Sequence, residues 1–501
     1  MASNMRKIFK EAGFTIGGSF VKAAIGFIIT VIITRFVSQE IYGIYTQAFT
    51  IVSVLLIIAS MGIPQAYTRY IPMYIEQKKE ELIPQLIRLG FLSTTLSSVF
   101  LVLVFYLLAP WIAGLFNEPQ IVTTLRVLLP ILPVLIWIRN MLYVFVAYKE
   151  LRYSVYIHRF IRPTIRIVVL TAMFLFSYEL SALITAEIVA PIIGLVVLIS
   201  WYRTRLHIPV FEKHEKVNLK KEIFSYSVPL AASQMVLLAL AYADIIMLGI
   251  YVDSDMVGIY KVMLDAAHMT TFIFMALALI YKPVVSGLFA RGDKAEIKKI
   301  FQKLNTWGIF LNGFLLLVVV TLGKSAISLA FTDAYLIGYP AMLILTLGYV
   351  GLSSFGNVGA TLEAVGKTKI ILIVSVAASL LNIGLNAALI PRFGLEGGAI
   401  ATAVASVSVP IIYCVAVRYY VGFFAFQKQV FAAFLSFGLI FAASVWLNTL
   451  NWELGWLLFL LLVAGLAILY FGLIIVFGGL KKGDKQFFIN LVKRNRLAKQ
   501  R

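Results

Sequence analysis

The sequence predicts an all-α polytopic membrane protein, and three observations support this fold class. Hydrophobic residues make up 61% of the 501 residues and charged residues only 13%, which is about half the charged share of a typical soluble domain. Apolar runs of about 20 residues recur along the chain, each long enough to cross a hydrocarbon core about 30 Å thick. Short polar turns separate these runs. We therefore expect about fourteen transmembrane helices.

Run length and polar punctuation place these helices along the chain. The first run is too long for a signal peptide and lacks a small-residue cleavage site, so we expect it to remain as the first span. The fourteen spans are expected at 13–36, 42–73, 86–110, 120–148, 153–177, 180–202, 223–250, 256–289, 301–323, 337–365, 369–391, 396–420, 428–448 and 454–479.

Lys and Arg residues are concentrated in every second connection between these spans. Charged examples are Lys78–Lys79 and the tail from Lys481, whereas the alternate connections hold only Arg35, Lys324 and Arg392. Because cytoplasmic loops carry the positive excess, both termini are predicted to be cytoplasmic, in a plasma-membrane protein. Contacts with anionic lipid headgroups and the positive cytoplasmic loops then explain the net charge of +20, so no nucleic-acid partner is expected.

A repeated motif divides the chain into two similar halves. Gly43-Ile44-Tyr45 recurs as Gly258-Ile259-Tyr260, an offset of 215 residues (258 minus 43). The turn Phe116-Asn117-Glu118 matches Phe331-Thr332-Asp333 at the same offset. Six spans per half is an even number, so both copies enter the bilayer in the same sense. We predict two parallel six-helix repeats, related by a pseudo-twofold axis along the membrane normal, followed by two C-terminal helices.

The domain boundaries follow from this repeat and from one basic, polar segment between the halves. They are an N-lobe at 1–205 with spans 1–6, a cytoplasmic linker at 206–221, a C-lobe at 222–425 with spans 7–12, spans 13–14 at 426–480, and a basic cytoplasmic tail at 481–501.

Ionisable residues inside the predicted spans are costly, at roughly 2.5–3.5 kcal/mol each, and so point to function. In the second half carboxylates such as Asp244 appear, whereas the first half has mainly cations against Glu187. On a regular helix, the four arginines of span five fall within an arc of about 80° and extend roughly 21 Å. Pro163 is expected to kink this helix. These four are Arg152, Arg159, Arg162 and Arg166.

We interpret these cations as a site for an anionic headgroup, because guanidinium groups bind phosphate and carboxylate oxygens in bidentate geometry. The pattern does not identify the anion. The predicted substrate-binding residues are Lys22, Arg69, Arg139, Arg159, Arg162 and Arg166.

Purely structural alternatives exist for several of these cations. Arg152 and Arg159 can extend to the cytoplasmic interface, and Lys22 and Arg69 can do the same from the ends of their spans. Arg166 can instead be a partner of an intramembrane acid, Glu187, at similar depth.

A second candidate site lies in the second half. Asn382 and Asn386 share one face of span eleven, and Thr402 of span twelve can reach the same space. Together with Asp244, these oxygens are compatible with Na⁺ or H⁺ as a coupling ion. A hydrogen-bonded structural role for Asp244 is the alternative.

Other functional classes lack their motifs. Gly323-Lys324-Ser325 and Gly366-Lys367-Thr368 look like the ends of P-loops, but Val318 and Thr361 stand where the first glycine is required. Cys414 is the only cysteine and the histidines show no ligand spacing, so we expect no metal site and no disulfide within the chain. No paired carboxylates or catalytic triad occur in a large aqueous segment, so an enzyme is not expected.

Three stretches resemble the Wzx-type oligosaccharide flippases of the multidrug/oligosaccharidyl-lipid/polysaccharide exporter superfamily. They are Ile33-Thr34-Arg35-Phe36 through Tyr45, Ala243 to Gly249 leading to Tyr260, and Asn382-Ile383-Gly384-Leu385-Asn386 to Thr402.

This resemblance implies two six-helix lobes around a cavity that opens alternately to each side. It implies movement of a polyprenyl-(pyro)phosphate-linked oligosaccharide from the inner to the outer leaflet, with membrane lipids around a monomer, and with glycosyltransferases or a polymerase as further partners. It also implies a coupling-ion site at Asp244, Asn382, Asn386 and Thr402, although related flippases have a carboxylate at the position of Asn386. No other cofactor is implied.

The same superfamily suggests the main alternative, a cation-coupled multidrug or metabolite antiporter. Such an exporter needs an acidic cavity, whereas this chain has Lys22 in span one. A membrane glycosyltransferase or polymerase is a weaker alternative, because a sizeable catalytic loop is missing.

Overall fold

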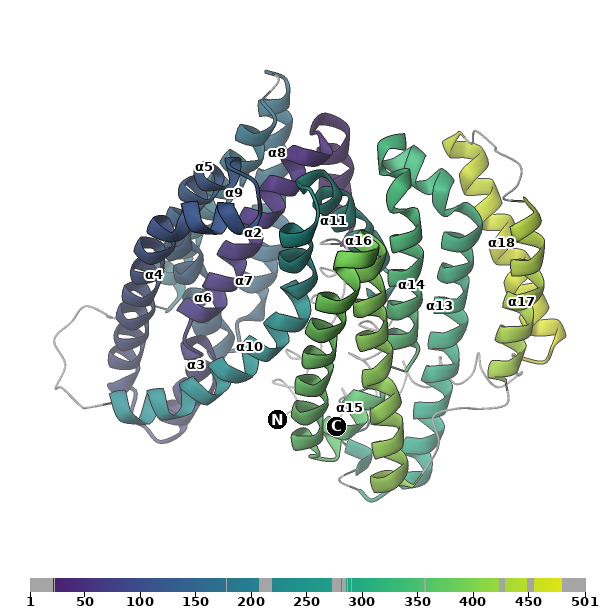
Figure 1. Ribbon diagram of the computed structural model, residues 1–501. Helices are drawn as coiled ribbons and strands as arrows, with labels where there is room; N and C mark the ends of the chain where they lie inside the picture. Colours follow the sequence, from purple (N-terminus) through teal and green to yellow (C-terminus); the bar gives the residue numbers. More distant parts are fainter. Residues whose placement is uncertain are drawn as a thin grey trace. The chain divides into compact units, whose positions relative to one another are not determined.

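The computed structural model describes residues 21, 23–176, 178–206, 219–272, 281, 285, 287–289, 291–355, 357–422, 429–447 and 455–479. These residues form helices and connecting turns, and no strand occurs among them. They divide into two compact units (Figure 1). We call residues 17–261 with 386–394 the N-terminal unit, and residues 1–16, 262–385 and 395–501 the C-terminal unit.

The N-terminal unit begins, within its described part, with a short apolar helix at Ala23–Phe36. Its further elements are α2 (Gln39–Ala59), α3 (Ile63–Glu76), α4 (Leu82–Leu115), α5 (Gln120–Leu128), the 3₁₀ turn η1 (Leu129–Ile131), α6 (Leu132–Ala147), α7 (Leu151–Val155), the π-helical turn η2 (Tyr156–Ile161), α8 (Arg162–Phe174), α9 (Leu180–Trp201), the π-helical turn η3 (Tyr202–Leu206), α10 (Lys220–Tyr251) and the first half of α11 (Ser254–His268).

The C-terminal unit holds the rest of α11 and the helices that follow it. These are α13 (Lys294–Ala330), the 3₁₀ turn η4 (Asp333–Gly338), α14 (Tyr339–Ser354), α15 (Asn357–Ala364), α16 (Thr368–Val421), α17 (Val430–Leu447) and α18 (Trp456–Val476). Helix α13 packs against α14, α17 and α18, so the two appended C-terminal helices lie on its flank.

The longest helix, α16, has 54 residues, or about 81 Å at 1.5 Å per residue, which is far more than one membrane crossing needs. It breaks at Gly394, whose φ of 53° and ψ of −123° are not helical. This break lies between the spans predicted at 369–391 and 396–420. Residues 386–394 of this helix belong to the N-terminal unit.

Every predicted span overlaps a helix, so the all-α membrane fold class is confirmed. By length and composition, eight helices of the described residues can cross a membrane, and a ninth if the bent pair Lys220–Val236 and Ala241–Tyr251 is one span. The number of fourteen crossings, the positions of the lobes and their linker, and the cytoplasmic location of the termini stay predictions.

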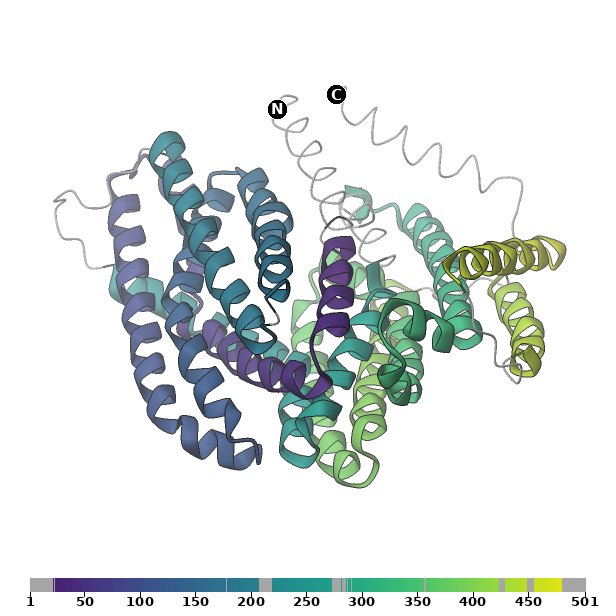
Figure 2. The ribbon, with the colours of Figure 1, turned by 90° about the horizontal axis from the view of Figure 1, so that it is seen from above.

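Small residues let the helices of the N-terminal unit approach closely, as is common between membrane helices. Gly62 has a φ of 70° and is the residue directly before α3, in the turn that separates α3 from α2. A Cβ at Gly62 would overlap the carbonyl oxygen of Ser227 in α10. Helix α10 therefore packs against α2 and α3, as the two views show (Figures 1 and 2).

A buried polar pair joins α4 to α6 in the same unit. The Asn140 side-chain amide donates a 2.8 Å hydrogen bond to Thr94 Oγ1, and both residues are fully buried. The Thr94 hydroxyl itself donates to the carbonyl of Gly90. A side-chain amide in an apolar layer needs such an acceptor, because no water is present there to accept its hydrogen bond.

We expect Thr94→Val to destabilise the protein by about 0.6–2 kcal/mol, because the Asn140 amide loses its acceptor. Thermal unfolding of the purified protein in detergent measures this change. The matched control is Ser93→Ala, since the Ser93 hydroxyl bonds only backbone carbonyls of its own helix. Equal melting temperatures for the two variants would contradict the expectation.

Candidate functional site: an arginine cluster in the N-terminal unit

The helix of predicted span five is not a regular α-helix. Its middle is the π-helical turn η2, which ends one residue before Arg162 and two before Pro163. Proline has no N–H to donate and crowds the carbonyl four residues earlier, and a wider i→i+5 turn removes this conflict. Arg159 lies in the π-helical turn, so the predicted arc of about 80°, which assumed 100° per residue, is wrong across this segment.

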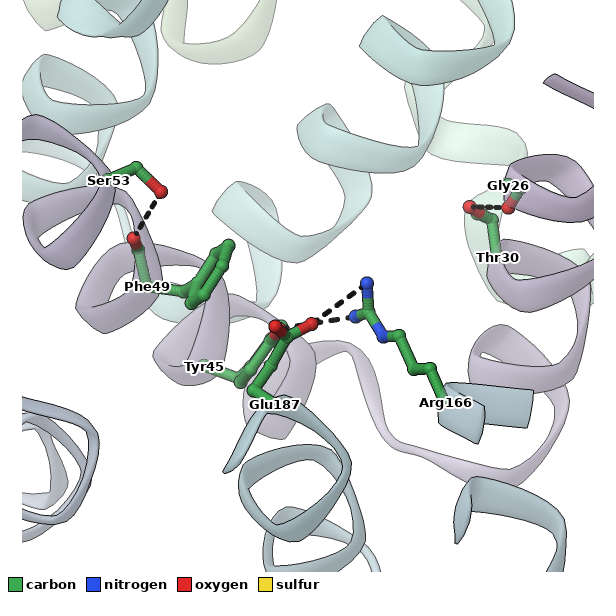
Figure 3. Close-up of polar contacts among 7 residues, drawn as sticks. All are labelled: Gly26, Thr30, Tyr45, Phe49, Ser53, Arg166 and Glu187. Carbon is green, nitrogen blue, oxygen red and sulfur yellow. Dashed lines mark hydrogen bonds and ion pairs between the residues drawn. The ribbon is translucent and has the colours of Figure 1, made fainter. Parts of the chain in front are cut away.

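Arg166 forms an ion pair inside the membrane region. Its Nη1 lies 2.9 Å from Oε1 of Glu187 in α9, and its Nη2 donates a 3.2 Å hydrogen bond to the Tyr45 hydroxyl in α2. The Tyr45 hydroxyl also hydrogen-bonds Glu187. Figure 3 shows these three side chains converging from α2, α8 and α9. Glu187 is 5% exposed and Tyr45 4% exposed. The predicted alternative, Glu187 as the partner of Arg166, is confirmed.

Arg162 lies one turn earlier in α8 and extends along α9. A Cβ at Gly194 would lie 3.1 Å from Cγ of Arg162, so the missing side chain of this glycine makes room for the arginine. Nε of Arg162 is buried without a hydrogen-bond acceptor among the described residues. The charges that act on this guanidinium are Glu187, which attracts it, and Arg166, which repels it. Only Arg166 pairs directly with Glu187, and Arg162 feels that carboxylate at longer range.

The remaining predicted arginines occupy different surroundings. Arg139 in α6 donates a 3.1 Å hydrogen bond to the Gln234 side chain of α10. Arg69 is exposed, with its guanidinium 4.3 Å from the ring centroid of Tyr226 in α10. Arg159 is half-buried.

Arg152 pairs with Glu150 at 2.9 Å and is largely exposed, which fits the alternative of an interfacial arginine. Lys22 lies outside the described residues. The structure thus brings Arg162 and Arg166 together near Glu187, whereas Arg139 and Arg69 contact Gln234 and Tyr226 of α10 instead.

Among the predicted coupling-ion residues, Asp244 in one unit and Asn382 with Thr402 in the other take part in side-chain hydrogen bonds. In the N-terminal unit, Asp244 is 3% exposed and accepts a 2.9 Å hydrogen bond from the Tyr260 hydroxyl and another from its neighbouring backbone N–H. In the C-terminal unit, the Asn382 amide donates to Thr402 Oγ1 at 3.3 Å.

Asn386 is buried in the part of α16 that belongs to the N-terminal unit. Groups of three or more His, Cys, Asp or Glu residues able to hold a metal are absent from the described part of the chain.

Sequence reasoning missed several residues of these sites. Tyr45, Gly194 and Gln234 carry no charge, so a search for ionisable residues inside spans passes over them. Tyr45 and Tyr260 nevertheless had a signal, because both belong to the repeated Gly-Ile-Tyr motif. A tyrosine at the same place in both halves is a candidate for a hydrogen bond to whichever charge its half contains.

Long apolar helices with an ion pair and an additional guanidinium group among them indicate a multi-pass membrane protein. More particularly, the chain belongs to the polysaccharide biosynthesis protein family, whose model matches residues 8–289. The model of the MatE family matches residues 229–388.

Three relatives show the breadth of this similarity. An uncharacterized membrane protein of Methanocaldococcus jannaschii is 23% identical over 80% of this chain and 82% of its own length. The capsular polysaccharide biosynthesis protein CapF of Staphylococcus aureus is 22% identical over 45% of this chain and 57% of its own. The probable low-salt glycan biosynthesis flippase Agl15 of Haloferax volcanii is 22% identical over 42% and 44%. This chain thus matches less than two thirds of the last two proteins.

Solved structures show the same fold at low sequence identity. The lipid II flippase MurJ in an inward closed conformation has a TM-score of 0.73 and 14% identity, and the match covers 95% of this chain and 98% of that one. A multidrug resistance MATE family transporter of the MOP superfamily, in an inward-facing conformation, has a TM-score of 0.67 and 11% identity over 80% and 94%.

We expect Glu187→Gln to lower stability by up to about 3–5 kcal/mol, because Arg166, whose side chain is only 26% exposed, loses its carboxylate. Thermal unfolding in detergent measures the loss. Glu150→Gln is the matched control, since its partner Arg152 is 48% exposed and can turn to water, so this change should cost less than Glu187→Gln. The double variant Glu187→Gln/Arg166→Gln should recover part of the loss. A Glu187→Gln protein as stable as the control would contradict the assigned ion pair.

Proposed function

We propose that this protein is a flippase that moves a polyprenyl-(pyro)phosphate-linked oligosaccharide from the inner to the outer leaflet by alternating access, for surface polysaccharide or glycan assembly. The observation that carries the proposal is the group of Arg162, Arg166 and Glu187, which has one more positive charge than negative charge. Membership of the polysaccharide biosynthesis protein family supports it, as does the similarity to CapF, Agl15 and the lipid II flippase MurJ.

A phosphate or pyrophosphate group suits this arrangement. Arg162 has a donor without an acceptor among the described residues, and a guanidinium group binds two phosphate oxygens at once. Arg166 is held by Glu187 and Tyr45, so it contributes positive charge from a fixed position. In this proposal Arg162 makes the direct contact, Arg159 and Arg139 extend the basic path, and Lys22 and Arg69 receive the headgroup near the cytoplasm. The lipid tail stays in the bilayer.

The neutralising effect of Glu187 suits transport rather than storage. A carrier must release its cargo after the conformational change, so its states must differ only moderately in affinity for the cargo. Several contacts of moderate strength achieve this better than one deep anion site. The coupling of transport to Na⁺ or H⁺ through Asp244, Asn382, Asn386 and Thr402 is part of the proposal, as is action as a monomer beside glycosyltransferases or a polymerase.

A cation-coupled multidrug or metabolite antiporter is the second candidate. The match of the MatE model and the buried carboxylate of Asp244 favour it. Drug-resistance profiling distinguishes the two candidates. Increased tolerance to organic cations without a glycan phenotype would favour the antiporter.

We expect Arg162→Gln to lower the flipping rate by at least tenfold, since a charge-assisted contact to the phosphate is lost. The assay follows a fluorescent polyprenyl-pyrophosphate sugar in vesicles that contain the purified protein. Arg152→Gln is the matched control: it removes an arginine of the same helix segment that is exposed and paired with Glu150, so its rate should stay within twofold of wild type. Wild-type flipping by Arg162→Gln would remove the arginine cluster from the mechanism.

A further inference from the structure

The two copies of the Gly-Ile-Tyr motif pack against each other within the N-terminal unit. A Cβ at Gly43 in α2 would overlap the carbonyl of Ser254 in α11, and one at Gly258 in α11 would overlap the carbonyl of Gln39 in α2. Each glycine thus contacts the residue four positions before the other glycine. Such Cβ atoms would lie 3.1 and 3.0 Å from the backbone nitrogen of the opposite glycine. The contact is therefore symmetric, backbone against backbone.

Two residues after each glycine, a tyrosine hydroxyl reaches the intramembrane charge of its own half. Tyr45 accepts a hydrogen bond from Arg166 and is bonded to Glu187, while Tyr260 donates to Asp244. The Tyr45 ring also stacks on Phe49, with centroids 5.7 Å apart and an angle of 11° between the planes (Figure 3). The tyrosine of the same three-residue motif therefore contacts an arginine–glutamate pair in one half and, in the other, an aspartate on which the charge of Lys261 also acts.

We propose that Tyr45 and Tyr260 are positioning residues that couple the arginine cluster to Asp244 through the glycine crossing of α2 and α11. This inference rests on the proposed function, because it assumes that the arginine cluster binds an anion. Neither tyrosine touches the cargo in this proposal. Tyr45 fixes Arg166 relative to α2, and Tyr260 fixes Asp244 relative to α11.

The close contact explains how one site influences the other. Because neither glycine has a Cβ, the two backbones lie in direct contact. One helix therefore has no space to shift independently of the other. Ile44 and Ile259, which follow the glycines, are almost fully buried. A change at Asp244 that displaces Tyr260 therefore displaces α11, then α2, and then Tyr45 with its partner Arg166. Coupling of this kind is reciprocal between the two sites.

The test measures binding of inorganic pyrophosphate to the full-length protein in detergent by titration calorimetry. Asp244→Asn, which replaces the carboxylate by a neutral side chain of similar shape, should change pyrophosphate affinity at least fivefold, the lower limit of typical coupling. In a Tyr260→Phe background the same substitution should change affinity by less than twofold. Tyr67→Phe is the matched control background, because it removes another buried tyrosine hydroxyl of the unit, one bonded only to a backbone carbonyl, and should leave the coupling intact.

A second measurement does not depend on the folding of the Asp244 variant. Tyr45→Phe and Tyr260→Phe are combined, and the double variant should depart at least threefold from the product of the two single effects on pyrophosphate affinity. Independent effects, or an Asp244→Asn effect that survives in Tyr260→Phe, would overturn the coupling while wild-type binding still supports the proposed function. A wild-type protein that binds no pyrophosphate would overturn both.

Discussion

The constraint on which this structure depends is that a charge placed among apolar helices must find a partner there. Arg166 meets it with Glu187 and Tyr45, and the three residues come from α8, α9 and α2. A buried ion pair contributes little net stability, because removing both charges from water costs about as much as their attraction returns. Breaking it is expensive, however, so the pair dictates which faces of these helices meet. Gly194 adapts α9 to this arrangement, since only a residue without a side chain leaves room for Arg162.

The second half meets the same constraint with other residues. The oxygens of Asp244 accept hydrogen bonds from a tyrosine hydroxyl and a backbone N–H, and the cation that acts on this carboxylate is Lys261 rather than an arginine. The duplicated motif thus keeps the helix crossing and the tyrosine, while the charge that the tyrosine contacts differs between the halves.

Most of the fold could be predicted because a membrane helix follows from composition and length alone. Every predicted span overlaps a helix, and Gly394 interrupts α16 between two of them. The predicted 80° arc of the span-five arginines is wrong across the π-helical turn before Pro163, and no periodicity in the sequence reveals that turn. The partner of Arg166 was foreseen as an alternative from depth alone. Tyr45, Gln234 and Gly194 were not, since side-chain convergence from separate helices depends on packing that one sequence does not encode locally.

The excess of one positive charge in the cluster has an energetic consequence for a carrier. At about 4 Å and an effective dielectric constant of about 20, one unpaired charge attracts an anion by about 4 kcal/mol, or roughly a thousandfold in affinity. A second free guanidinium at a similar distance would add a comparable amount, and the anion would leave correspondingly slowly. Glu187 neutralises the charge of Arg166 and so removes that second attraction, while Arg166 keeps its contacts with Glu187 and Tyr45. In the proposed function, the carboxylate inside an otherwise basic group therefore sets the anion affinity low enough for release, and Arg162 keeps it high enough for capture.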